Sequence, residues 1–378
     1  MLILAAILAI FVYGIIAAMF GTIIPALAKQ LALSDSQVGF IFTAQALGLT
    51  IASISVGPLI DSKGKKVGLL LGLGLVAVAL YGLAITAGYE MTVTFAVLLG
   101  LGGGIIVTGA NALVSDINPA NRGSVMNGLN LFFGLGGLVT PLLASGLLGG
   151  DPVKLAYFAA ALTTITLAVH FMTKMPAPTG ERGFKAGEMN SLLSQPVLYL
   201  LAAFLFLYVA CEVGVWNWLA KHLIAQGLPE STALRILSLG FALGILLGRV
   251  AVAPVLIKVP AATVTLASSV LMAITTYAML QTNDPTSAGI AVFLAGLAMA
   301  PVFPTTLAMV GGAFPNRTAT AMGIVITSGW IGLLVSSPII GSVAGSSGLR
   351  TALLLLPAFS VLMIVVNLMM RPMLKAQA

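Results

Sequence analysis

Charged residues are scarce in this chain. Only 7% of its 378 residues are Asp, Glu, Lys or Arg, whereas 59% are hydrophobic and the mean hydropathy is +1.12. A soluble fold of 38.6 kDa cannot bury that much apolar surface. The apolar runs are about 20 residues long and lack the polar alternation of barrel strands. The composition therefore predicts an all-α integral membrane protein.

Reactive side chains are equally scarce. The single cysteine, Cys211, excludes a disulfide within the chain and leaves a metal-thiolate centre without ligands. The two histidines, His170 and His222, are isolated in the sequence, so we interpret both as structural or solvated. An enzyme would need paired carboxylates, a metal cluster or an activated nucleophile. We therefore expect a protein that is not an enzyme and has neither cofactor nor metal.

The apolar runs predict twelve transmembrane helices, six in each half. The first run has no charged leader and no small-residue cleavage site, so we expect it to be retained. The expected spans are 3–28, 36–60, 67–88, 91–114, 123–149, 153–173, 196–220, 232–257, 260–281, 286–311, 317–343 and 349–370.

A repeat relates the two halves. The segment from Pro119 to Met126 recurs about 196 residues later as Pro315 to Met322, with Arg122 matched by Arg317. Duplicated halves made of apolar helices are typical of secondary transporters, whose substrate site lies near the middle of the bilayer. The sequence thus predicts two pseudo-symmetric six-helix bundles.

The predicted division of the chain follows from its polar break. Residues 1–173 form the N-terminal bundle, 174–195 a cytoplasmic linker and 196–378 the C-terminal bundle. The linker is polar and rich in Pro and Gly, and a short amphipathic piece is expected around 184–193.

Orientation is predicted from Lys and Arg. With a cytoplasmic N-terminus, eleven of these residues fall on the cytoplasmic face and five on the other, with Arg249 inside a span. This excess satisfies the positive-inside tendency and places both termini in the cytoplasm. The net charge of +7 then indicates contact with anionic lipid and not with nucleic acid.

The loop between the second and third spans carries a motif. It runs Gly57-Pro58-Leu59-Ile60-Asp61-Ser62-Lys63-Gly64-Lys65-Lys66 and resembles the G-x-L-x-D-R-x-G-R-K loop of the major facilitator superfamily. Asp61 at a helix end can accept hydrogen bonds from a neighbouring helix N-terminus or pair with a base such as Arg122. We expect a latch on the cytoplasmic side; alternatively, these charges only stop the helix and set topology. The predicted cytoplasmic gate comprises Gly57, Asp61, Gly64, Lys65, Asp116, Arg122 and Arg317.

Further segments resemble the fucose permease branch of that superfamily. They are residues 102–104, 108–111, 116–123, 126–127, 208–219, 303–305, 314–317 and 327–329. The resemblance implies uptake of a sugar or sugar-like solute by alternating access, often with a cation such as a proton or sodium. Where that branch carries acids on its first and fourth helices, this sequence has Gly21 and Val107. Glu212 is therefore the sole candidate for a coupling residue; alternatively, it is a structural acid paired with backbone or with Arg249 or Lys221.

Uncharged polar side chains and tryptophans predict the substrate site. Sugars need hydrogen-bonding groups and an aromatic plane. The candidates are Gln45, Thr108, Asn111, Asn127, Asn130, Glu212, Trp216, Asn217, Thr327 and Trp330. Each of the polar groups could instead join two helices, Asn127 and Asn130 could belong to the inner gate, and Trp218 suits an interfacial anchor.

A second transport hypothesis stays open. Sixteen methionines and few buried charges would also suit an exporter of amphipathic drugs or lipids, since Met-rich surfaces repack around varied ligands. A receptor on the same scaffold is conceivable too. In each case we expect a multi-pass protein of the cytoplasmic membrane that functions as a monomer.

Overall fold

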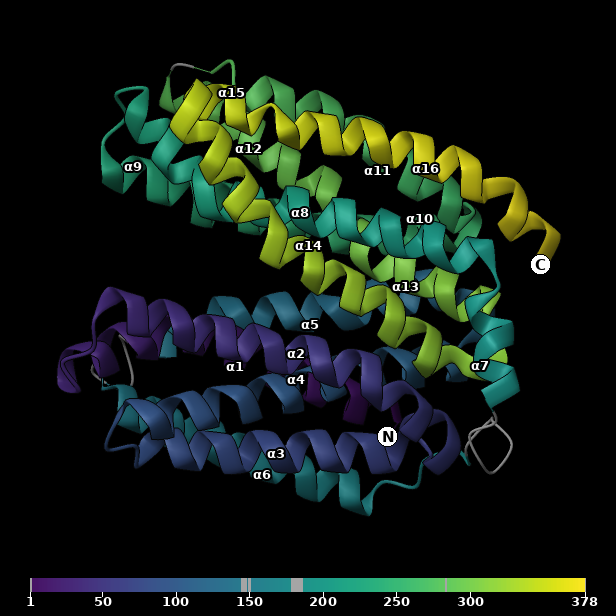
Figure 1. Ribbon diagram of the computed structural model, residues 1–378. Coiled ribbons are helices and arrows are strands. Elements are labelled where there is room, and N and C mark those ends of the chain that lie inside the picture. Colours follow the sequence, from purple (N-terminus) through teal and green to yellow (C-terminus); the bar gives the residue numbers. More distant parts are fainter. Residues whose placement is uncertain (1, 144–147, 149–150, 178–185, 283, 378) are drawn as a thin grey trace. The chain divides into compact units, whose positions relative to one another are not determined.

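The computed structural model describes residues 2–143, 148, 151–177, 186–282 and 284–377 (Figure 1). These residues are mostly helical, and none of them forms a strand. They group into two compact units. The first comprises Met1–Ile117, Leu129–Glu188 and Phe314–Thr327, and the second comprises Asn118–Gly128, Met189–Ala313 and Ser328–Ala378.

The first unit is built on the N-terminal helices. They are α1 (Leu2–Gln30), α2 (Asp35–Lys63), α3 (Lys65–Ala84), α4 (Tyr89–Ile117), most of α5 (Arg122–Leu142) and α6 (Pro152–Met172). Helix α4 packs against both α2 and α3, and α6 packs against α1 and α3 (Figure 1). The unit also contains the one-turn η4 (Pro315–Arg317) and the start of α14 (Thr318–Ser347).

The second unit holds the C-terminal helices. They are α8 (Pro196–Ala225), α9 (Glu230–Arg235), η3 (Ile236–Phe241), α10 (Ala242–Lys258), α11 (Ala261–Met279), α12 (Pro285–Met299), α13 (Val302–Ala313), the rest of α14, α15 (Leu349–Leu353) and α16 (Leu355–Gln377). Helix α16 packs against α8 and α11, and α12 packs against α10 and α11. The one-turn η1 (Pro119–Asn121) and the start of α5 belong here as well.

The predicted spans agree closely with the helices. Eleven helical stretches within the described residues are long and apolar enough to cross a membrane. Helix α5 is a further long helix of 21 residues. The end of its predicted span, 123–149, includes residues 144–147 and 149, which lie outside the described part.

Two irregularities interrupt spans that the sequence predicts as continuous. Between α12 and α13 the helix stops at Ala300 and Pro301. Neither Pro301 nor Pro304 has an N–H to donate, so the carbonyls of Leu297 and Ala300 lack their usual i+4 partners. The second irregularity is the π-helical turn η3, which separates α9 from α10. Residue counts and hydropathy do not detect either feature, because both segments remain apolar.

The predicted linker, 174–195, is described only in part. Residues 178–185 lie outside the described part, while α7 (Ala186–Leu193) confirms the short helix expected around 184–193. The predicted boundaries between bundle, linker and bundle stay a prediction. The units differ from those boundaries in one respect: the beginnings of α5 and α14, which carry the sequence repeat, are each grouped with helices of the other half of the chain.

Candidate functional site

A carboxylate at the end of α2 caps the first turn of α14 within the first unit. Asp61 Oδ1 accepts from the N–H of Ala319 at 3.1 Å, and its Oδ2 accepts from the N–H and hydroxyl of Thr320 at 2.8 and 2.6 Å. Asp61 is fully buried. The first N–H groups of a helix have no acceptor within the helix and carry a partial positive charge. A carboxylate supplies the missing acceptors and offsets this charge. Of the two expected partners of Asp61, the structure contains the helix N-terminus.

Two glycines make this approach possible. A Cβ on Gly57 would overlap the backbone of Ala319 and Thr320, so only glycine lets α2 come this close to α14. Gly64 has φ +97°, a conformation that side chains disfavour, and it ends α2 while starting α3. The motif glycines thus place Asp61 and Lys65 on either side of a sharp turn.

A buried ion pair lies next to this cap. Lys65 Nζ is 2.5 Å from Asp116 Oδ2, and the two side chains are 3% and 12% exposed. The Thr318 hydroxyl donates to Asp116 Oδ1 at 2.8 Å. Asp116 lies near the end of α4, so the start of α14 is bound by carboxylates from two helices. Five of the seven predicted gate residues therefore form one cluster: Gly57, Asp61, Gly64, Lys65 and Asp116.

The two predicted gate arginines belong to different units. Arg317 ends η4 in the first unit and is half-buried. Arg122 starts α5 in the second unit, where it lines a pocket together with Lys258 and Arg371. Their part in a gate stays a prediction.

Polar candidates of the first unit form a bonded amide pair. Asn130 on α5 donates its Nδ2 to Asn111 Oδ1 on α4 at 3.0 Å, and Asn111 Nδ2 donates to the Val107 carbonyl at 2.8 Å. Both side chains are buried. One turn before Asn111, the buried Thr108 hydroxyl has no hydrogen-bond partner of good geometry. The pair thus joins two helices, as the structural alternative anticipated.

The other first-unit candidates are less enclosed by polar groups. Gln45 on α2 is half-buried. The Thr327 hydroxyl on α14 makes a long hydrogen bond of 3.5 Å to the Thr50 carbonyl on α2. This contact extends the attachment of α14 to α2 that Asp61 begins.

The second unit contains a polar face on α8. Tyr208, Glu212 and Trp216 recur at intervals of four residues and so share one side of the helix. The Tyr208 hydroxyl is fully buried and lies near the Glu212 carboxylate, but it has no hydrogen bond of good geometry. Glu212 is half-buried and Trp216 is 39% exposed. The Trp216 ring packs edge-on against Phe241 of η3, with centroids 5.2 Å apart.

Arg249 supplies positive charge to this face. Its buried guanidinium interacts electrostatically with Glu212 and Tyr208. Its Nε donates to the Ala300 carbonyl at 3.5 Å, which is one of the acceptors released by the helix break at Pro301 and Pro304. An acid inside a membrane span is costly unless it is paired or hydrated. Here Arg249 is the cation near Glu212, and its hydrogen bond to the Ala300 carbonyl at the helix break orients its guanidinium.

The remaining second-unit candidates bond to neighbouring helices. Asn127 donates to the Gly123 carbonyl at 2.8 Å and to the Thr305 hydroxyl on α13 at 3.0 Å. Asn217 donates to the Ser337 hydroxyl on α14 at 2.7 Å. Trp330 is half-buried on α14. Lys221 lies over the Trp218 ring at 5.4 Å, so Trp218 has a charged partner of its own near the end of α8.

Within the described residues, no group of three or more His, Cys, Asp or Glu side chains could hold a metal ion. The Cys211 thiol is buried and lies 3.5 Å from the Leu356 carbonyl. His170 and His222 are also buried. The candidate residues described above offer hydrogen bonds, ion pairs and, at Glu212, a carboxylate that can transfer a proton.

Comparison with known proteins identifies the family. The model of the Major Facilitator Superfamily matches residues 6–257 and 226–377. The chain belongs to this superfamily. It is accordingly a multi-pass membrane transporter and not an enzyme, and the predicted all-α membrane fold of the superfamily is confirmed.

Two curated relatives are similar to this chain. The MFS-type transporter YfkL of Bacillus subtilis, itself described as uncharacterized, is 23% identical over 348 residues, covering 90% of this chain and 88% of that protein. The quinolone resistance protein NorA of Staphylococcus aureus is 30% identical over 100 residues, which is 26% of each chain. One of these relatives is named as a transporter and the other as a resistance protein, and neither name gives a substrate for this chain.

Solved structures show the same fold. The transporter FucP in the outward conformation superimposes with a TM-score of 0.86 at 17% identity, covering 97% of this chain and 98% of that chain. The proton:xylose symporter XylE gives a TM-score of 0.81 at 14% identity, with 96% and 94% covered. The resemblance to this superfamily that the loop motifs predict is thus confirmed at the level of the fold.

Sequence reasoning missed several residues that complete these clusters. Thr320 binds Asp61 and Thr318 binds Asp116, and the position of both threonines shortly after Arg317 in the second copy of the repeat was an available signal. Tyr208 stands one turn before Glu212 and could have been found by the same spacing that linked Glu212 to Trp216. No sequence pattern assigns Thr305 to Asn127, because they are 178 residues apart.

Proposed function

We propose that this transporter moves a small polar solute of the sugar class across the cytoplasmic membrane by alternating access, as a facilitator or a cation symporter. The observation that carries the proposal is the face of α8 on which the Glu212 carboxylate and the partly exposed Trp216 ring are one turn apart. A carboxylate accepts hydrogen bonds from sugar hydroxyls, and an indole ring stacks on the apolar face of a pyranose. Two proteins of the same fold, a fucose:proton symporter and a proton:xylose symporter, support the same class.

Glu212 is also the proposed coupling residue. It can be charged next to Arg249 or neutral when a proton binds, and a solute hydroxyl can interact with either form. Binding of proton and solute to one carboxylate would link their transport. The other predicted contacts, from Gln45, Thr108, Asn111, Asn130 and Thr327 in the first unit and Asn127, Asn217 and Trp330 in the second, are proposed to complete the solute's hydrogen bonds.

The gate cluster supports alternating access. We propose that Asp61 and Asp116 hold the start of α14 in one state and release it in the other. Both termini are proposed to be cytoplasmic, with each chain functioning alone as a monomer within the lipid bilayer.

The test is ligand-dependent thermal stabilisation of the detergent-purified protein with a panel of monosaccharides, disaccharides and amphipathic drugs. A bound ligand raises the melting temperature by mass action. We expect a shift with one hexose or pentose and none with its epimers, and we expect Trp216→Ala to abolish that shift. When transport is measured with Glu212→Gln, the matched control is Glu90→Gln, because Glu90 is an exposed acid at the start of α4.

A second candidate function is export of amphipathic compounds. The specific observation in its favour is the similarity to NorA over 100 residues. In that case, hydrophobic cations or lipids would stabilise the protein and every sugar in the panel would leave its melting temperature unchanged.

A further inference from the structure

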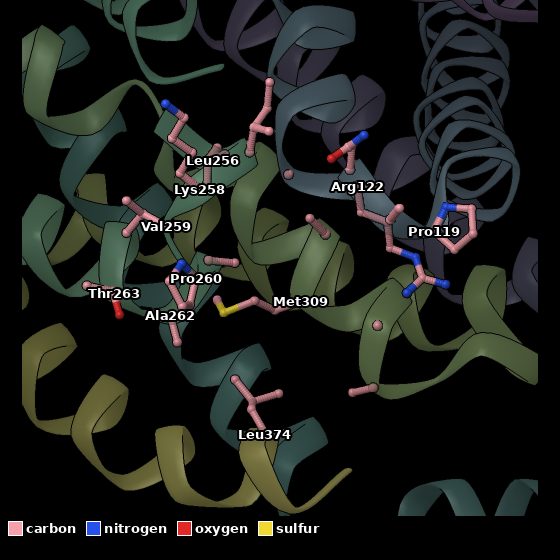
Figure 2. A pocket seen from close by; sticks show the side chains of 18 of the residues that line it. Pro119, Arg122, Leu256, Lys258, Val259, Pro260, Ala262, Thr263, Met309 and Leu374 are labelled. Atoms are coloured by element: carbon pink, nitrogen blue, oxygen red, sulfur yellow. The ribbon is translucent and has the colours of Figure 1, made fainter. Parts of the chain in front are cut away.

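A second site lies in the second unit, away from the polar face of α8. A pocket of about 720 Å³ opens where α10 ends and α11 begins. It is bounded by residues 119–123 at the start of α5, the end of α13 and the last turns of α16. Figure 2 shows Lys258, Pro260 and Thr263 along one wall, Pro119 and Arg122 along the opposite wall, and Met309 between them.

Positively charged side chains line the pocket. Its lining includes the cations Arg122, Lys258, Arg371 and Lys375, and no carboxylate is among the described residues that line it. These four come from three helices that are distant in sequence, α5, α10 and α16. The positive-inside tendency requires basic residues on the cytoplasmic face, but it does not require them to converge on one hollow.

One of these cations is already fixed in the wall. Arg371 donates from its Nη2 to the Thr263 hydroxyl at 2.6 Å, and its side chain is half-buried. A guanidinium has five N–H donors in a planar fork, so this single bond orients the group while leaving donors for an incoming anion. Lys258 and Lys375 line the same pocket and are exposed.

The backbone also contributes positive electrostatic potential to the pocket. Helix α11 begins at Ala261, directly after Pro260, and both residues line the pocket. The N-terminal turn of α11 therefore borders the hollow, and the dipole of this 19-residue helix favours a negative charge at this end.

We propose that this pocket binds a phosphate group, held by Arg371, Lys258, Lys375 and Arg122 and by the N-terminus of α11. Two sources share this chemistry. One is the headgroup of an anionic phospholipid, since basic pockets between helices on the cytoplasmic side bind such headgroups. The other is a soluble phosphate or phosphate ester from the cytoplasm. The site is independent of the sugar proposal, because none of its residues belongs to the α8 face.

The experiment uses two probes on the full chain. Detergent-purified protein is titrated with inorganic phosphate against chloride at equal ionic strength, and protein in nanodiscs is compared at increasing fractions of phosphatidylglycerol in phosphatidylcholine. The melting temperature is read in both series. We expect a saturable rise with at least one probe, because a ligand that binds the folded state stabilises it.

Variants assign the effect to the pocket. In Lys258→Gln/Arg371→Gln, the half-saturating concentration of the active probe should increase at least tenfold, since each removed charge near a headgroup weakens binding roughly fivefold. Lys29→Gln/Lys154→Gln removes the same charge from exposed positions outside the pocket and should titrate like the wild type. Lys258→Arg/Arg371→Lys keeps the charge and guards against loss through misfolding; it should retain saturable binding.

The outcomes separate the sources. A response to phosphatidylglycerol without one to phosphate supports the site with a lipid as its ligand, and a response to phosphate supports it with a soluble anion. The proposal is overturned if neither probe raises the melting temperature, or if the pocket variant and the control variant respond alike.

Discussion

Asp61 binds the first turn of α14 through both of its carboxylate oxygens, with Thr320 as its main partner. The hydroxyl and the N–H of Thr320 donate to the same oxygen, Oδ2, at 2.6 and 2.8 Å. The residues are separated by 259 positions in the sequence, yet both belong to the first unit. The start of α14 is therefore attached to α2 by hydrogen bonds that depend on one carboxylate.

Removing this carboxylate should destabilise the protein. Asp61→Ala leaves the buried N–H groups of Ala319 and Thr320 without acceptors, which should cost about 2 kcal/mol. Asp61→Asn keeps one carbonyl oxygen and should lose about half as much. Thermal unfolding in detergent measures both. The matched control is Asp284→Asn, because Asp284 is an exposed helix cap whose N–H acceptor role an Asn side chain retains; equal losses in the three variants would contradict this account.

The Lys65–Asp116 pair makes a second prediction. Lys65→Met leaves the carboxylate of Asp116 buried with Thr318 as its remaining neutral donor, and should lower stability by about 3 kcal/mol. The double variant Lys65→Met/Asp116→Asn removes the unpaired charge as well. It should recover much of the loss, because the cost of an isolated buried charge exceeds the net contribution of the pair. A double-mutant cycle of melting temperatures provides the measurement, and additive losses would show that the two residues act independently.

A variant of the Asn111–Asn130 pair distinguishes a structural role of these amides from a role in solute binding. Asn130→Leu removes the donor to Asn111 and, if the bond only joins α4 to α5, should cost about 0.6 kcal/mol and leave solute affinity unchanged. If these amides contact the solute, as proposed, affinity should fall at least tenfold with little further change in stability. Ligand titration and thermal unfolding on the same sample distinguish the two, and Asn367→Leu, which breaks a comparable amide–hydroxyl bond to Thr265, is the control.

Sequence reasoning predicted the helices and their approximate ends because hydropathy and length decide membrane insertion. It also identified Asp61, Lys65 and Asp116, since a charge at a helix end in an apolar chain has few uses. It did not predict the break at Pro301, because Pro is tolerated in transmembrane helices wherever other groups satisfy the freed carbonyls. Arg249, which satisfies one of them, lies 51 residues away. Pairings of this kind depend on helix packing, which sequence periodicity does not specify.

If Glu212 on α8 couples solute to protons, its replacement should change how solute transport responds to a pH gradient. Glu212→Gln should retain solute exchange at equilibrium but lose its response to a pH gradient, because Gln can hydrogen-bond to the solute but cannot release a proton. Glu90→Gln should keep the gradient response. Accumulation driven by an imposed gradient in proteoliposomes is the readout, and gradient-driven accumulation by Glu212→Gln would assign coupling to another residue.

Counterflow in proteoliposomes tests the central claim most directly. Vesicles loaded with unlabelled sugar are diluted into the labelled form, and the transient accumulation of label is followed for the wild type and for Trp216→Ala. We expect the wild type to accumulate one labelled sugar and not its epimers, and we expect Trp216→Ala to lose this accumulation. Absence of counterflow for every sugar, together with accumulation of hydrophobic cations, would contradict it and favour export of amphipathic compounds.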